Sequence, residues 1–118
     1  MQSWNLIGFE TPGGTRSPIV LHSTDEARAV LIGMAPGQVL GDHQVHEHAY
    51  MVVVDGSVQL QAGDQSLEAG PGTLVRFEEK ERHRVSSAEG ARLLLILAPW
   101  PGPGHYRGGP AQREVSSV

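Results

Sequence analysis

The most informative part of this chain is the segment His43-Gln44-Val45-His46-Glu47-His48-Ala49-Tyr50-Met51-Val52-Val53-Val54-Asp55-Gly56. Its first half holds three of the six histidines together with a carboxylate, and its second half is an apolar, β-branched run that is typical of a strand. Neutral imidazole is the commonest protein ligand for transition metals. His83 ends a second strand-like stretch and is the natural partner from elsewhere in the chain. The segment therefore indicates a strand with a metal site at its N-terminal end.

Glycine and proline divide the rest of the chain into short apolar runs. There are 15 glycines and 8 prolines among 118 residues, and no helix-length amphipathic pattern lies between them. The pair Asp55-Gly56 stands between two alternating runs and predicts a hairpin. Only residues 24–29 have the composition of a helical turn. Strands are expected over residues 4–9, 19–22, 27–34, 43–54, 57–61, 73–77, 83–86 and 92–97.

This spacing predicts a single all-β domain of about eight strands, built as a sandwich, barrel or jelly roll. The domain should cover residues 1–98. Residues 99–118 begin with a proline- and glycine-rich stretch that cannot form a central strand or a helix interior. We expect a C-terminal arm there that is partly disordered.

Composition narrows the classes of function. The chain has no cysteine, which excludes disulfides and thiolate metal ligands. Its formal charge of −4 argues against nucleic acid as a partner. The sequence shows neither a signal-peptide pattern nor the run of about 18 apolar residues that a membrane span requires. We therefore expect a cytoplasmic protein that binds neither nucleic acid nor membrane.

Two glycine-anchored segments resemble the two motifs of the cupin family. The first runs from Gly41 through the histidines to Gly56, and the second runs from Gly72 to His83. The resemblance covers about residues 27–97. It implies a double-stranded β-helix, or jelly roll, that often forms a dimer and holds a metal in its lumen with three histidines and one carboxylate. In the second motif, the spacing from Gly72 to His83 matches, while Glu78 and Lys80 replace the family's proline and glycine.

The first motif departs from the family pattern. When Gly56 is the anchor, the family's two histidine positions fall on His43 and Val45, and its carboxylate position falls on Ala49. When His46-Glu47-His48 is taken as the histidine pair, a valine occupies the carboxylate position. Neither alignment supplies the full ligand set.

Strand geometry leaves three site models open. Side chains alternate between the two faces of a strand, so His43 and Glu47 share one face while His46 and His48 share the other. In the first model, His43, Glu47 and His83 form a two-histidine, one-carboxylate set that suits Fe(II) or Mn(II). In the second, a bulge near residues 44–45 lets His46 and His48 bind the metal with His83. In the third, the barrel contains no metal.

Four further residues are candidates for roles near the metal. Glu47 could act as a general base, and Tyr50 could donate a proton or a hydrogen bond. Arg76 could hold an anionic substrate, because a guanidinium binds carboxylate or phosphate groups well. Met51 would line the lumen beside the substrate.

Two classes of function follow. The first is a metal-dependent enzyme that acts on a small organic molecule, as an oxygenase or an isomerase, with Fe, Mn, Zn or Ni as its divalent metal. The second is a metal-free module that binds or senses a small molecule. The expected partners are this small-molecule ligand and, from the family resemblance, a second copy of the chain in a homodimer.

Overall fold

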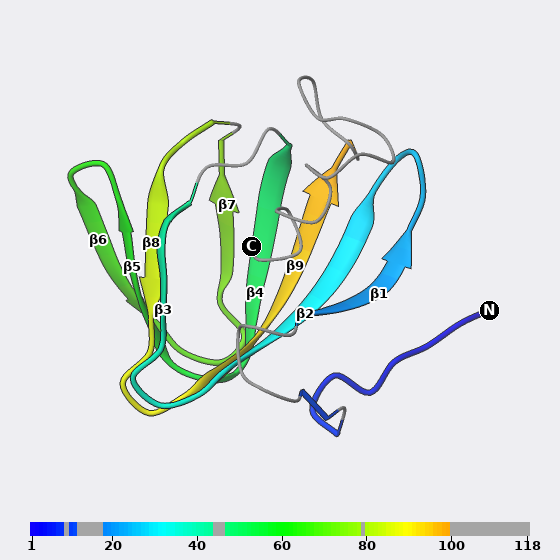
Figure 1. Cartoon of the computed structure of the whole chain (residues 1–118), viewed down its shortest axis with the longest axis horizontal. Helices are drawn as coiled ribbons and strands as arrows, with labels where there is room; N and C mark the ends of the chain where they lie inside the picture. Colours follow the sequence, from blue (N-terminus) through cyan, green and yellow to red (C-terminus); the bar gives the residue numbers. More distant parts are fainter. Residues whose placement is uncertain (9, 12–17, 44–46, 79, 100–118) are drawn as a thin grey trace.

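The computed structural model describes residues 1–8, 10, 11, 18–43, 47–78 and 80–99 (Figure 1). Within this part of the chain, every regular element is a β-strand, and the strands form two antiparallel sheets. The first sheet has the order β1-β2-β9-β4-β7, and the second has the order β3-β8-β5-β6. The strands are β1 (Ile19–Ser23), β2 (Arg28–Met34), β3 (Val39–His43), β4 (His48–Gly56), β5 (Val58–Ala62), β6 (Gln65–Ala69), β7 (Leu74–Phe77), β8 (His83–Ser86) and β9 (Ala91–Ala98).

The core lies between the two sheets. Along β4, Ala49, Met51 and Val53 are buried, while the alternate residues Tyr50 and Val52 face the other side. The same alternation buries every second residue of β9. Apolar side chains from both sheets complete the core: Val30, Ile32, Met34, Leu40, Val58, Leu60, Ala69, Phe77, Val85, Leu93, Leu95 and Leu97. The all-β prediction is confirmed, with nine strands in the described part of the chain.

Several local predictions are wrong. Residues 4–8 form no strand, and Leu6–Gly8 lie in a turn in which the Asn5 side chain accepts hydrogen bonds from the backbone N–H groups of Ile7 and Gly8. The expected strand over residues 43–54 is two strands, because β3 ends at His43 and β4 begins at His48. β3 and β6 were not predicted, since Gly41-Asp42 and the polar β6 have low strand propensity. Pairing with β8 and β5 overrides that preference.

Asp55-Gly56 does not form the predicted hairpin. β4 pairs with β7 and β9, whereas β5 pairs with β6 and β8, so the chain crosses from one sheet to the other at this point. Gly56 has a φ of 77°, and a Cβ on it would lie 2.2 Å from the carbonyl oxygen of Gly90. The two-residue hairpin turn lies instead at Gly63-Asp64, between the paired residues Ala62 and Gln65.

The crossing at Gly56 gives a stability prediction. We expect Gly56→Ala to lower the free energy of unfolding by about 3 kcal/mol or more, because the new methyl group meets backbone atoms in addition to the positive φ. Gly63→Ala is the matched control, since Gly63 also has a positive φ, 58°, but a Cβ on it would have no atom within 4 Å. Its expected loss is about 1–2 kcal/mol. Urea unfolding measures both, and equal losses would contradict the steric argument.

Candidate functional site

Four strand ends meet at one end of the barrel, the upper end in Figure 1. β3 ends there at His43, β4 begins at His48, β7 ends at Phe77, and β8 begins at His83. We call this end the rim. The predicted site residues His43, Glu47, His48, Arg76 and His83 all lie at or next to it, and His46 lies outside the described residues.

A bulge in β3 sets the register of His43. Leu40 is paired with Val85 and His43 is paired with His83, so β3 contains one residue more than β8 over this interval. Leu40 and Val85 are both core residues. The extra residue therefore gives His43 the register position opposite the buried His83. The bulge expected near residues 44–45 concerns residues outside the described part of the chain, and the observed shift precedes His43.

Glu47 is the most buried ionisable residue described at the rim. It is 0% exposed and continues the alternation of the buried Ala49 and Met51. Its electrostatic neighbour is Arg28, the first residue of β2. Burial lowers the pKa of the Arg28 guanidinium, and the negative charge of Glu47 offsets part of this change. A carboxylate and a guanidinium are thus held near each other at the boundary of the apolar core.

His83 is also buried, at 5% exposure. Its ring stacks on Phe77, with the ring centroids 3.9 Å apart and the planes 11° from parallel. Its Nδ1 lies 3.2 Å from the carbonyl oxygen of Glu81. In the tautomer that carries its proton on Nδ1, this N–H donates a hydrogen bond to the carbonyl, and Nε2 keeps a lone pair. In metal-binding histidines, a carbonyl or carboxylate group that accepts a hydrogen bond from the other ring nitrogen orients the imidazole in the same way.

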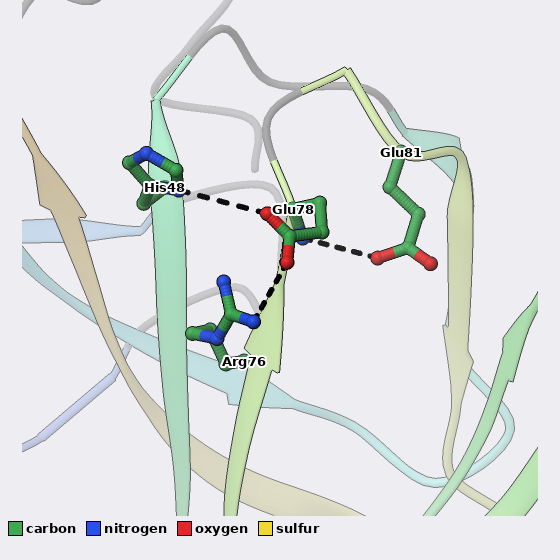
Figure 2. Close-up of polar contacts among 4 residues, drawn as sticks. All are labelled: His48, Arg76, Glu78 and Glu81. Atoms are coloured by element: carbon green, nitrogen blue, oxygen red, sulfur yellow. Dashed lines mark hydrogen bonds and ion pairs between the residues drawn. The ribbon is translucent and has the colours of Figure 1, made fainter.

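His48, Tyr50 and Arg76 lie on the outer face of the first sheet, where each is substantially exposed. Figure 2 shows that His48 and Arg76 both reach Glu78. Arg76 Nη2 is 2.6 Å from Glu78 Oε1, and His48 Nδ1 is 4.0 Å from Glu78 Oε2. The hydrogen bond and charge of Arg76 lower the pKa of the Glu78 carboxyl, and the same pairing raises the pKa of Arg76.

The structure thus brings Glu47 and His83 into the interior and places His48, Tyr50 and Arg76 outside it. Met51 lies in the core at 3% exposure. Among the side chains that the structure describes, no three histidine, aspartate or glutamate groups lie close enough to hold a metal.

Sequence reasoning missed Arg28. The signal was present, because Arg28 begins the alternation that continues with the core residues Val30 and Ile32. An arginine at the start of such a series is predicted on the core face of its strand, and Arg28 is partly buried there with Glu47 as an electrostatic neighbour. Because arginine is most often exposed, residue type alone predicts a surface position for Arg28.

A hollow lies at the opposite end of the barrel from the rim. It has a volume of about 400 Å³, lies beside Gly56 and Gly90, and has Asp55, Glu89 and Arg92 among its polar residues. None of the predicted site residues lines it. The rim therefore remains the candidate site, because it combines buried ionisable groups with the predicted histidines.

The fold has known relatives among solved structures. An RmlC-like cupin protein from Desulfovibrio desulfuricans is 21% identical, with a TM-score of 0.72 over 84% of this chain and 97% of that one. An RmlC-like cupin from Shewanella frigidimarina is 20% identical, with a TM-score of 0.69 over 76% and 81%. The DMSP lyase DddQ from Ruegeria pomeroyi is 17% identical, with a TM-score of 0.63 over 71% of this chain and 42% of that one. These likenesses confirm the jelly-roll fold.

No curated protein matched this sequence. Across the described residues, no helix is long and apolar enough to span a membrane. A family model described as "Cupin domain" matches residues 30–97. Because this match covers more than half of the chain, the protein belongs to the cupin family.

Proposed function

We propose that this cupin binds a divalent metal at its rim through His43, Glu47 and His83, and that it acts there on a small organic molecule. The observation that carries the proposal is the complete burial of Glu47. A carboxylate loses hydration when it is buried, and this loss is costly unless a cation compensates for it. Arg28 provides one positive charge near Glu47, and a metal ion would provide more.

Two further observations support the same ligand set. The Nδ1 contact of His83 with the Glu81 carbonyl is the kind of secondary interaction that orients a metal-binding imidazole. The bulge in β3 places His43 opposite His83 in the ladder. The donor set is therefore chemically suitable for Fe, Mn, Zn or Ni.

The reaction class follows from such a ligand set. Two histidines and one carboxylate leave coordination positions open, and a metal held there can activate dioxygen or polarise a carbonyl group. An oxygenase or isomerase activity fits this chemistry. The chain's own contribution is to orient the ligands and to exclude water, since the buried Ala49, Met51 and Leu97 lie directly below the rim.

The alternative function is a metal-free module that binds or senses a small molecule. One observation favours it: Arg28 already places a positive charge near Glu47. In that case the two side chains form the polar part of a ligand site, and Glu47 is the group that could accept a proton from the ligand.

Metal analysis separates the two functions. We expect the untagged full-length protein to bind about one divalent metal per chain. His83→Ala and Glu47→Gln should lose the metal, because each removes a ligand. His48→Ala is the matched control and should retain it, since His48 is half-exposed on the outer face. The measurement is elemental analysis after dialysis against each of the four metals, with circular dichroism to verify folding.

Other results of this experiment would contradict the proposal. Absence of metal from the wild-type protein under all four conditions would leave the metal-free function. Loss of metal from both His48→Ala and His83→Ala, with retention by Glu47→Gln, would favour the ligand set of His46, His48 and His83.

We also propose that a second copy of the chain covers the outer face of the first sheet. An aliphatic row crosses all five strands of this face, through directly paired residues. Its members are Ile19, Leu31, Leu94, Val52 and Leu74. Leu74 is 63% exposed at the end of the row. Ile19, Val52 and Leu94 are partly exposed, whereas Leu31 is fully buried within the chain, so the apolar surface open to a partner is the part of the row that ends at Leu74. Exposed apolar surface of this kind is typical of an interface.

Light scattering tests the dimer. The wild-type protein should have the mass of two chains, and Leu74→Glu should shift it to one chain, because a buried charge at the interface is unfavourable. Val39→Glu is the control, since Val39 is 42% exposed on a strand of the other sheet. A monomeric wild-type protein, or equal effects of the two substitutions, would disprove this interface.

A further inference from the structure

We infer that Glu81 is a positioning residue for His83, and that its carbonyl and its side chain together decide which ring nitrogen of His83 is offered to a metal. This inference rests on the proposed function, because His83 is one of the proposed metal ligands. It is carried by three hydrogen bonds of Glu81 and by the backbone of the connection between β7 and β8, in which Glu81 lies.

The first step concerns the ring of His83. The ring is stacked on Phe77, with the planes 11° from parallel, and both residues are buried. Stacking fixes the plane of an imidazole. A half-turn about the Cβ–Cγ bond leaves that plane unchanged, however, and moves both ring nitrogens to the positions of ring carbons. The contact with Phe77 therefore does not determine where Nε2 points.

The carbonyl group of Glu81 removes this ambiguity. Its oxygen lies 3.2 Å from Nδ1 of His83. A carbonyl oxygen can only accept a hydrogen bond, so the contact is favourable when Nδ1 carries a proton. In the flipped ring, a carbon atom would replace Nδ1 and the hydrogen bond would be lost. The carbonyl therefore selects one orientation and one tautomer of the ring, in which Nε2 is the nitrogen that can bind a metal.

The side chain of Glu81 holds this carbonyl in place. Its Oε1 accepts a hydrogen bond of 3.0 Å from the backbone N–H of Glu78, and Figure 2 shows this contact. The backbone N–H of Glu81 donates in turn to the carbonyl oxygen of Glu78, at 3.1 Å. Two hydrogen bonds thus join the same two residues in opposite directions. The bond to the carboxylate is the stronger kind, because its acceptor is ionised.

The backbone of the connection makes this support necessary. Lys80 has a φ of 64°, in the left-handed region that residues other than glycine rarely adopt. The cupin motif has a proline and a glycine where this chain has Glu78 and Lys80. Glycine would adopt this φ without strain, and proline has no backbone N–H that requires an acceptor. In this chain, the Glu81 carboxylate accepts from the N–H that proline would lack.

The first measurement is the tautomer of His83 in the metal-free, full-length protein, from long-range ¹H–¹⁵N NMR with ¹⁵N-labelled histidine. A sample at about pH 8.5, roughly two units above the ordinary histidine pKa, contains neutral rings. The spectrum of His83→Ala identifies the signals of His83. We expect the proton on Nδ1 in the wild-type protein. Glu81→Ala should give a mixture of the two tautomers, because the carbonyl is no longer held.

The second measurement is the affinity for Zn²⁺, from competition with a chromophoric chelator. Glu81→Ala should weaken binding about 10-fold, the lower limit for loss of a group that orients a metal ligand. Glu81→Gln should restore the tautomer, and bring the affinity within about threefold of wild type, because an amide oxygen accepts the same hydrogen bond.

Glu78→Ala is the matched control for both measurements. It removes a carboxylate from the same connection but keeps the backbone N–H that donates to Glu81. Its exposed ion pair with Arg76 contributes little, so the Zn²⁺ affinity should change less than about twofold. Circular dichroism verifies that each variant is folded.

Several results would overturn the inference. They are a proton on Nε2 of His83 in the wild-type protein, equal spectra and affinities for wild type and Glu81→Ala, equal losses in Glu78→Ala and Glu81→Ala, and failure of Glu81→Gln to restore the wild-type behaviour.

The inference and the proposed function fail separately. A wild-type protein that takes up none of the four metals, but whose His83 changes tautomer in Glu81→Ala, would remove the metal site and leave Glu81 as the group that orients His83. Metal binding that requires His83 but is unaffected by Glu81→Ala would have the opposite meaning.

Discussion

The ladder between β4 and β9 is the interaction on which the rest of this structure depends. It aligns Ala49 with Leu97, Met51 with Leu95 and Val53 with Leu93, and all six side chains are buried. Because side chains alternate along a strand, a slip of one residue would turn this apolar set outward. The same register decides which residues near the rim face inward. It aligns Glu47 with the core series and directs His48 to the outer face.

The rim combines groups that are costly to bury. Glu47 and His83 are almost fully buried, and the nearby Arg28 is partly so. Replacing such groups with apolar residues often stabilises a fold. Their retention at one place in a protein therefore indicates a role in binding or catalysis. Among the described residues below the rim, the buried side chains are apolar except Ser87, whose hydroxyl donates a hydrogen bond to the Ser57 carbonyl. The contrast between these two layers is the physical reason for placing the function at the rim.

Membership of the cupin family explains the architecture, and it does not select the chemistry. One fold supports many functions, and cupins often bind divalent metals. In this chain the usual ligand pattern is altered, since Ala49 takes the carboxylate position and Val45 takes a histidine position. Glu47, two residues before Ala49, is the buried carboxylate among the residues that the structure describes. Arg28 adds a positive charge near it.

The sequence by itself determined the all-β class, the core face of β4, and the two segments that meet at the rim. Those features depend on the two-residue period of a strand and on glycine and proline, which act over a few neighbouring residues. Only the tertiary structure decided that Asp55-Gly56 joins two sheets, that β3 bulges before His43, and that Arg28 lies near Glu47. These features depend on pairing between strands far apart in the chain. Local sequence patterns carry no information on which distant strand will be the partner, so the charge that shapes the site became visible only in the folded protein.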